Sequence, residues 1–515
     1  MVRSTLGPEV FQVTANLRRR LHERQRRIKA RLDPKLQRNR SQPMFLDQNI
    51  HYDLADKTHG LHSAGLGICQ QLVQRLGLAQ ALNSQLHLFK RHFPYFESDH
   101  ILNLTYNFLV GGKNLQDLER LRNQEYYLDV LGAQRIPDPT TAGDFLRRFS
   151  ATDLDTLMNV INDKRLSVWQ QQPPAFFAQA IVEGDGTLVA TSGECKQGAD
   201  MAYDGTWGYH PLLISLANTQ EPLFVVNRSG NRPSYEGAAA YFDKAADLCR
   251  RAGFRQILFR GDTDFTQAAH LDRWQQAGIG FVFGIDAQPN LVDRAQGLPE
   301  RVWTELERPA GYQVKTAPRQ RPANVKDEVV RRRGYRNVRV LSEQVAEFNY
   351  QPGPCQETYL IVVLRKQLLW EQGGVEVDRE TRYFFYITNR WTWSCAEVVR
   401  FANDRGNQEN LVEQLKNGVP ALRAPVNTLE ANGAWMVLGA LAWNLKVWLG
   451  LLQPGTTYGQ RLLTLEFKGF LSEVMLLPCQ IVRASGRLLY RVLQWNPWVE
   501  MLCAMSARLR QLCWT

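Results

Sequence analysis

The sequence predicts an α/β protein in which a mixed sheet is interrupted by a β-rich insertion and flanked by helical regions. Between residues 176 and 290, apolar runs of strand length alternate with helical patterns. Residues 291–390 change to basic, proline-rich loops and further β-type runs. On either side of these segments, apolar residues recur at the three- and four-residue spacing of helices, as they do over residues 66–86.

The predicted core consists of strand-like segments and two helices. Three strands come first, then a helix, a strand, a second helix and a last strand, an order compatible with the RNase H-like topology. The strands are expected at 178–183, 211–216, 222–227, 256–260 and 280–285, and the helices at 235–252 and 265–277.

The net charge of +11 is concentrated in two short segments. Residues 17–40 contain eleven Lys and Arg against two acidic residues, and residues 315–339 contain nine against two, so the remainder of the chain is acidic. Two local basic segments favour a polyanion bound at defined places, with nucleic acid the first candidate. The alternative for either segment alone is a solvated face or a disordered tail.

A chain of 515 residues has room for two to four domains. Changes in composition and pattern divide it into segments. These are a basic N-terminal arm (1–45), a helical region for DNA binding or dimerisation (46–175), the first part of the core (176–290), the β-rich insertion (291–390), the second part of the core (391–450) and a helical C-terminal region (451–515).

The cysteines and the most apolar segment bear on the cellular compartment. The eight cysteines have no C-x-x-C spacing, so we expect no zinc site. The N-terminus lacks the apolar stretch of a signal peptide, and we expect a reduced, cytoplasmic protein. The most apolar helix, 434–452, is interrupted by Asn444 and Lys446, which favours a core helix over a membrane span.

Local signals predict several details of the helices. Thr140 or Thr141 is expected to cap the helix that follows the turn at Pro137. Ser394 with Glu397 has the form of a capping box at the start of the helix expected over 394–417. In the N-terminal region, glycines nearby favour ordinary polar residues over a metal site for Asp56, His59 and His62.

Asp185 lies in the stretch 181–190, Ile-Val-Glu-Gly-Asp-Gly-Thr-Leu-Val-Ala, between two glycines. The apolar run before it predicts a buried strand with one carboxylate, and the glycines let a bulky partner approach the backbone closely. A charge on a core strand is costly unless it is paired, and a metal ion is one such partner. The alternative for this stretch alone is a turn aspartate in a hairpin.

A second apolar strand ends in Gly261-Asp262. The C-terminal end of a strand is where ligands bind in open α/β sheets. Asp264 competes for the same role, because on a continuing strand both side chains would face the same side. We favour Asp262, since Asp264 precedes the helix expected from Phe265 and is expected to serve as its N-cap.

A third carboxylate, Glu409, lies in the helical pattern over 398–416. Arg405, Glu409 and Lys416 are expected on one helical face, so that two cations flank a carboxylate. The alternative is a surface helix laced with ion pairs. Gly406 argues against that alternative, because glycine costs a helix about 1 kcal/mol and suits a place where a ligand comes close.

Two strand aspartates and one helix glutamate are the set needed to hold two divalent ions about 4 Å apart. Carboxylate oxygens suit Mg²⁺, and Mn²⁺ is an alternative. Such ions would activate an attacking oxygen and stabilise a leaving one, while the flanking cations would hold a DNA strand by its phosphates.

With these three motifs, the chain resembles the DDE transposases of bacterial insertion sequences, which have an RNase H-like fold. More narrowly, it is similar to the cut-and-paste group with a β-insertion before the glutamate and the signature Tyr-x2-Arg-x3-Glu-x6-Lys. Arg405, Glu409 and Lys416 match that spacing, whereas the tyrosine position is Ala402. Gly-Asp-Gly-Thr resembles the first-aspartate motif and Arg-Gly-Asp-Thr-Asp-Phe the second.

The resemblance implies an enzyme that binds double-stranded DNA at the terminal inverted repeats of its element and at the target. Asp185, Asp262 and Glu409 would be catalytic and would hold two Mg²⁺ ions. Cleavage would free a 3′ hydroxyl that attacks the other strand or the target, in a homodimer that pairs the ends in the nucleoid, away from any membrane. The residues expected to bind DNA are Arg405, Lys416, Arg18, Arg19, Arg20, Arg26, Arg27, Arg331, Arg332 and Arg333.

Two alternative functions stand beside this one. The first is a nuclease with an RNase H-like fold that does not transpose, and the β-insertion and the Arg/Glu/Lys helix argue against it. The second is a catalytically silent DNA-binding derivative. The presence of all three carboxylates argues against this second alternative.

Overall fold

The computed structural model describes residues 15–33, 51, 59–90, 94–308, 325–453, 455–484 and 486–512. Asp56, parts of the basic arm and the first basic residues of the 315–339 segment lie outside the described residues.

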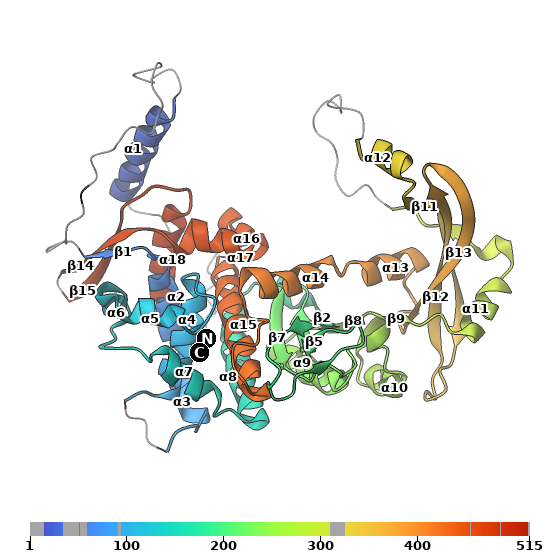
Figure 1. Ribbon diagram of the computed structural model, residues 1–515, viewed down its shortest axis with the longest axis horizontal. Helices are drawn as coiled ribbons and strands as arrows, with labels where there is room; N and C mark the ends of the chain where they lie inside the picture. The colour runs from blue at the N-terminus through green and yellow to red at the C-terminus, as the bar shows by residue number, and fades with distance from the viewer. Residues whose placement is uncertain are drawn as a thin grey trace, which may run out of the picture.

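A single mixed sheet forms the centre of the α/β part of the molecule (Figure 1). Its strands are β2 (Gln179–Gly186), β6 (Leu212–Leu216), β7 (Glu221–Val226), β8 (Gln256–Gly261), β9 (Gly280–Ile285), β10 (Thr304–Glu305), β11 (Arg336–Tyr350), β12 (Tyr359–Gln372) and β13 (Val375–Thr388). The nine strands lie in the order β10-β11-β12-β13-β9-β8-β2-β6-β7. All the predicted core strands are therefore present in one sheet.

The core strands pair both antiparallel and parallel. β6 lies antiparallel to β2, and β7 antiparallel to β6. β8 lies parallel to β2, and β9 parallel to β8, as crossover helices between them require. Those two crossover helices are α9 (Ala238–Ala252) and α10 (Ala268–Gln276).

The β-rich insertion extends the core sheet. β13 pairs antiparallel with β9, from Phe385 opposite Ile285 to Thr388 opposite Val282. β12 joins β13 through the turn at Gly373-Gly374, whose positive φ angles of 61° and 87° suit a two-residue hairpin. The remaining helices of the insertion are α11 (Pro289–Gln296) and α12 (Val325–Arg333).

Helices cover the core sheet on both faces. On one face, Phe242 of α9 contacts Phe259 of β8, with ring centroids 4.7 Å apart. On the other face, Arg260 of β8 reaches the backbone of α13 (Cys395–Asn403), because successive side chains of a strand point to opposite sides. The predicted Ser394–Glu397 capping box begins α13. After α13 follow α14 (Gly406–Glu413) and a π-helical segment, Gln414–Gly418.

The long helix α15 (Leu429–Leu451) joins the sheet to the helical regions. Its length and composition would allow it to cross a membrane, yet it is buried throughout within the protein, which matches the predicted core helix. Its polar residues have partners: Asn444 donates to the Pro222 carbonyl at 3.1 Å, and Lys446 to the Leu463 carbonyl at 3.3 Å. The strand β7 and the helices of the N-terminal region therefore pack around one apolar core.

The N-terminal region is helical, as predicted. Its helices are α1 (Ala15–Arg31), α2 (Leu66–Arg75), α3 (Leu78–Gln85), α4 (Glu97–Leu109), α5 (Asp117–Arg122), α6 (Glu125–Leu131), α7 (Pro139–Leu146) and α8 (Ala151–Trp169). The predicted cap of α7 was wrong: Asp138 is the N-cap and accepts a hydrogen bond from the Thr141 N–H at 2.9 Å. Because Pro139 takes the first helical position, the helix begins before either threonine.

The C-terminal region contains a hairpin besides its helices. Its helices are α16 (Thr457–Thr464), α17 (Phe467–Phe470) and α18 (Val499–Gln511). The hairpin consists of β14 (Cys479–Ala484) and β15 (Arg487–Val492), and β14 also pairs with β1 (Gly60–Leu61). A third, small sheet is formed by β3 (Val189–Ala190), β4 (Asp200–Met201) and β5 (Trp207–Tyr209). The C-terminal region predicted to be helical therefore also contains a hairpin that was not predicted from the sequence.

Candidate active site

Asp185 and Asp262 lie at the same edge of the sheet. Glu183 of β2 is the register partner of Arg260 on the parallel strand β8. Asp185 and Asp262 each follow two residues later: Asp185 lies near the end of the pairing of β2 with β6, beyond the β2–β8 pairing, and Asp262 directly follows β8. This is the edge at which open α/β sheets bind ligands.

The glycines around Asp185 have a packing reason. A Cβ at Gly184 would lie 2.9 Å from the rings of Phe242 and Phe265, on the α9 side of the sheet. A Cβ at Gly186 would lie 2.8 Å from Nε2 of His210. The bulky groups that approach these glycines are thus side chains of the protein itself. The Asp185 side chain points to the opposite face of the sheet from Gly184.

Arg405 holds the two aspartates together. Its guanidinium lies 3.3 Å from the Asp262 carboxylate and 3.8 Å from that of Asp185. One Nη2–H also donates to the Gly184 carbonyl at 3.4 Å. A single arginine therefore spans the ends of β2 and β8, and this contact with carboxylates was not foreseen for a residue predicted to bind DNA.

The helix predicted over 394–417 is interrupted where Arg405 lies. α13 ends at Asn403, and Arg405 is the N-cap of α14 with φ −96° and ψ 0°, outside helical geometry. This break turns the Arg405 side chain toward the sheet. Among the described residues, no atom lies within 4 Å of the place where a Cβ on Gly406 would be, so protein packing does not account for that glycine.

Burial and nearby charges shift the pKa values of Asp185 and Lys416 at this edge of the sheet. Burial raises the pKa of Asp185 to about 6, the nearby Arg405 opposes that rise, and Asp262 adds to it. Burial also lowers the pKa of Lys416, against the charges of Glu413 and Asp185. The charge of Asp185 thus acts on Lys416, whereas Arg405 lies within ion-pair distance of both aspartates.

Glu409 lies one helical turn from Arg405, and its N–H donates to the Arg405 carbonyl at 3.2 Å. Its side chain is exposed on α14. Within the described part of the chain, no group of three His, Cys, Asp or Glu side chains gathers closely enough to hold a metal ion. The structure thus brings Asp185 and Asp262 together through Arg405 and does not gather Glu409 into one group with them. The two aspartates offer the hard oxygen donors that Mg²⁺ takes.

The cap prediction at the second aspartate was wrong. Asp262 is the N-cap of a short 3-10 helix, Thr263–Phe265, and accepts a hydrogen bond from the Asp264 N–H at 3.0 Å. The α-helix that follows begins only at Ala268, with Gln267 as its N-cap and no side-chain cap bond. Asp264 is exposed and caps nothing, because the tight turn places Asp262 in that role.

The position of the signature tyrosine is buried. Ala402 is 7% exposed and packs in the apolar cluster between α13 and the sheet. A hydroxyl near this end of α13 comes instead from Tyr386 of β13, which donates to Asn403 at 3.4 Å. A role for Tyr386 had no signal in the sequence, because its approach to α13 depends on the pairing of β13 with β9.

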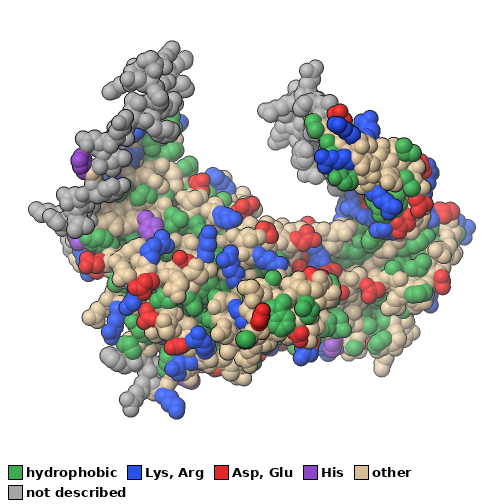
Figure 2. All heavy atoms as spheres, in the orientation of Figure 1, with side chains coloured by type: hydrophobic (Ala, Val, Ile, Leu, Met, Phe, Trp, Pro, Cys, Tyr) green, Lys and Arg blue, Asp and Glu red, His purple; other side chains and the backbone are tan. Residues whose placement is uncertain are grey.

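The predicted DNA-binding arginines lie on two projections. Arg18, Arg19, Arg20, Arg26 and Arg27 are exposed on α1, and Arg331, Arg332 and Arg333 are exposed on α12. The two helices rise at opposite ends of the molecule on the same side, with α13 and α14 between them (Figure 1). The surface is hollowed between the two projections, and Lys and Arg side chains gather around α12 (Figure 2).

Both projections are attached to the body of the protein. In α1, Leu21 is buried, Arg18 pairs with Glu500 at 3.2 Å, and Arg24 donates to the Val492 carbonyl at 2.6 Å. In α12, the stem of Arg331 packs over Gly374, at the turn between β12 and β13. α1 ends at Arg31, shortly before Pro34, a residue that cannot continue a helix.

Comparison with known proteins gives a family and a likeness to solved structures. The family described as Transposase DDE domain group 1 matches residues 60–514. The cryo-EM structure of a piggyBac transposase synaptic complex with hairpin DNA is similar at a TM-score of 0.37 and 10% identity, over 80% of this chain and 81% of that chain. That likeness is too weak to support an argument about activity. No curated protein matches the sequence.

Proposed function

The chain belongs to the transposase family of DDE domain group 1, and from that premise we propose that it is the transposase of its own insertion sequence. It binds the terminal inverted repeats of that element, cuts the DNA there and joins the freed ends to a target. The observation that carries this proposal is the pairing of Asp185 and Asp262 by Arg405 at one edge of the sheet.

The strand arrangement supports an RNase H-like core. The order β7-β6-β2-β8-β9 has three antiparallel strands followed by two parallel ones, with helices at both crossovers. Along the chain these elements come as three strands, a helix, a strand, a helix and a strand, which is the order predicted from the sequence and compatible with that topology. The first aspartate then lies on the central strand and the second beside it.

The site fits divalent ions, which transposases of this class generally use. We infer that Asp185 and Asp262 supply carboxylate oxygens to Mg²⁺, or to Mn²⁺, and that Glu409 completes the ligand set for two ions. Bound ions would activate the attacking oxygen and stabilise the leaving one.

The protein itself positions the DNA and balances charge. Arg405 and Lys416 bring two cations to the aspartate edge, where a phosphate of the scissile strand would bind. Arginines of α1 and α12 would contact phosphates on either side of the hollow between the projections. The duplex would then cross the exposed Glu409 on α14, where Gly406 leaves room for its backbone.

Two ends must be cut and joined, so we propose that two copies of the chain act together. A symmetric homodimer supplies one aspartate site to each end. We expect the complex to work on DNA in the cytoplasm, at the nucleoid.

A cleavage assay tests the proposal. The purified chain is incubated with Mg²⁺ and a duplex that contains one border of the DNA element encoding it, beside a duplex of scrambled border sequence. Nicking at the border supports the proposal. Cleavage of both duplexes alike would identify a nuclease that does not transpose, and border binding without cleavage would identify a silent derivative.

A further inference from the structure

A buried ion pair lies directly behind the two aspartates. Glu183 is 0% exposed and Arg260 is 1% exposed. The Arg260 Nε lies 2.5 Å from the Glu183 carboxylate, across the register pair of β2 and β8. Each residue precedes an aspartate by two positions, so the ion pair lies on the same face of the sheet as Asp185 and Asp262.

Arg260 also holds the end of α13. Its Nη1–H donates to the Phe401 carbonyl at 2.8 Å, and its guanidinium lies 4.7 Å from the centroid of the Phe401 ring. The same nitrogen lies 3.6 Å from the carboxylate of Asp404. Phe401 is in the last turn of α13, where the negative end of the helix dipole makes a positive charge favourable.

The contact between Arg260 and the end of α13 lies just before the break between α13 and α14. Asp404 and Arg405 separate α13 from α14, and Arg405 is the residue that spans both aspartates. On the other side of the break, Gln408 is buried and accepts a hydrogen bond from Ser215 of β6. The start of α14 is thus fixed to the sheet by buried polar contacts on both sides.

We propose that Arg260 and Glu183 are positioning residues, which fix the junction of α13 and α14, and with it Arg405 and Glu409, against the two aspartate strands. The proposal rests on the proposed function, since it concerns the same site. Hydrophobic residues can replace a buried ion pair at little cost in stability, or even with a gain. The pair supplies directional bonds here: from β8, the Arg260 side chain bonds both to Glu183 of β2 and to the end of α13.

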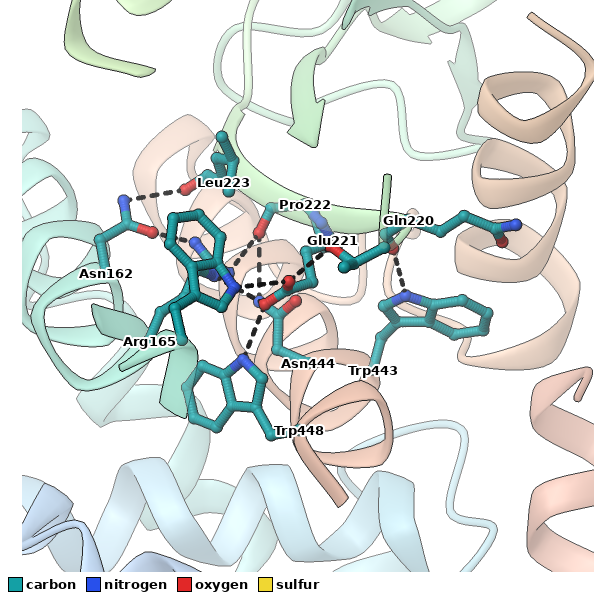
Figure 3. Close-up of polar contacts among 11 residues, drawn as sticks. Asn162, Arg165, Gln220, Glu221, Pro222, Leu223, Trp443, Asn444 and Trp448 are labelled. Carbon is teal, nitrogen blue, oxygen red and sulfur yellow. Dashed lines mark hydrogen bonds and ion pairs between the residues drawn. The ribbon is translucent and has the colours of Figure 1, made fainter. Parts of the chain in front are cut away.

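The chain contains a matched control (Figure 3). Arg165 of α8 and Glu221 of β7 are both 0% exposed and lie 3.0 Å apart. Glu221 also accepts hydrogen bonds from the indole N–H groups of Trp169 and Trp448, at 3.0 Å and 2.8 Å. This second pair joins α8, β7 and α15 and makes no contact with the aspartate edge, so it separates an effect on stability from an effect on position.

The experiment compares Glu183→Met/Arg260→Met with Glu221→Met/Arg165→Met in the full chain. For each we measure the melting temperature, the rise in melting temperature with Mn²⁺ alone, the affinity for border DNA, and the rate of border nicking at saturating DNA. Arg260→Lys and Arg165→Lys serve as a second pair of variants, because lysine keeps the charge but cannot bond to the strand and the helix end together.

For the Glu183/Arg260 variants we expect a nicking rate at least about tenfold lower, with border affinity within about twofold of the wild type. The Mn²⁺ concentration for half of the thermal shift should rise several-fold, because Glu409 is no longer held near the aspartates. The Glu221/Arg165 variants should keep the wild-type nicking rate and the wild-type Mn²⁺ concentration for half of the thermal shift, wherever they remain folded. The proposal would be overturned if, in both sets of variants, the nicking rate fell in proportion to the decrease in melting temperature.

The metal measurement separates this proposal from the proposed function. If the wild type binds Mn²⁺ but cuts no border DNA, the proposed function fails, while the Mn²⁺ response still reports on Arg260. An unchanged Mn²⁺ response in the Glu183/Arg260 variants, in a wild type that does nick DNA, contradicts the positioning role alone.

Discussion

The guanidinium of Arg405 lies 3.3 Å from the carboxylate of Asp262, although the two residues are far apart in the sequence and belong to different segments of the core. The same guanidinium reaches Asp185. An arginine predicted to bind phosphate is thus also a counter-charge for the two carboxylates. A divalent ion that binds those carboxylates would compete with Arg405 for the same oxygens.

The first prediction follows from this competition. Arg405→Met should bind Mn²⁺ about tenfold more tightly than the wild type, because no cation is displaced from the aspartates. Border nicking should nevertheless fall, since the scissile phosphate loses a cation. Mn²⁺ titration followed by thermal shift, with nicking on the same preparation, measures both. Weaker Mn²⁺ binding by the variant would show that Arg405 orders the aspartates for the metal instead.

Glu409→Gln is predicted to reduce border nicking by at least about 100-fold while border binding stays unchanged, because a carboxylate ligand is lost without a change in shape. Glu413→Gln is the control, since Glu413 is also exposed on α14 and should retain activity. Gel shift and nicking on one border duplex measure the two effects. Wild-type nicking by Glu409→Gln would remove this residue from the site.

Asp262→Asn should be inactive but folded, and Asp264→Asn should be active. Asparagine can cap the 3-10 turn that Asp262 begins, so stability should change by less than about 1 kcal/mol. Asp264 is exposed and caps nothing, so its charge is dispensable for the fold. Mg²⁺-dependent nicking and melting temperature decide the assignment, and activity only in Asp262→Asn would reverse it.

Lys446 gives a prediction for the pH dependence of stability. Burial lowers the pKa of Lys446 from its usual 10.5 to about 7. Between these two pH values the unfolded chain carries a proton on Lys446 that the folded chain lacks. The contribution of Lys446 to the free energy of unfolding therefore has its full value above about pH 10.5 and decreases as the pH falls to about 7. Lys446→Met removes this dependence.

At pH 7 the Lys446→Met variant should therefore be more stable than the wild type. The difference should shrink by at most about 1.4 kcal/mol per pH unit as the pH rises toward 10. Urea unfolding of both proteins at several pH values measures it. A difference that does not change with pH would mean that Lys446 is charged within the fold.

The basic projections should govern the salt dependence of DNA binding. Arg26→Gln with Arg27→Gln should lower the slope of log affinity against log salt by about 0.9 for each phosphate that the protein no longer neutralises. Arg331→Gln with Arg332→Gln should act similarly from the other side of the hollow. Arg147→Gln is the control, because Arg147 is exposed at the C-cap of α7, and α7 lies away from both projections (Figure 1). An unchanged slope in either double variant would place its projection off the DNA path.

The fold was predictable wherever short-range pattern decides structure. The core strands lie within a few residues of their predicted bounds, because apolar runs bounded by turn residues leave few alternatives. The pairing of β13 with β9 was not predictable, since it joins residues about a hundred positions apart. Without that pairing, the insertion reads as a separate unit rather than a continuation of the core sheet.

The sequence predicted which residues belong to the candidate site, but not how those residues are arranged in space. Asp185 and Asp262 were found from strand ends, and the structure brings them together. The break before Gly406 had a local signal in Asn403-Asp404, residues that often end helices, but the periodicity of the surrounding residues hid it. Glu183 and Arg260 also had a signal, as charges inside apolar strand runs two residues before each aspartate. Their pairing needed the register of β2 and β8.

The continuity of the sheet has a consequence for how far α12 reaches. Because β11, β12 and β13 are hydrogen-bonded through to β9, backbone geometry sets the span from the aspartates to the Arg331–Arg333 cluster. Removing two residues from each strand near the Gly373-Gly374 turn would keep every side chain on its face and draw α12 inward by about 7 Å. Along a duplex this corresponds to about two base pairs. The strands β11, β12 and β13 would thus fix the distance between the phosphates that α12 contacts and the phosphate that is cut.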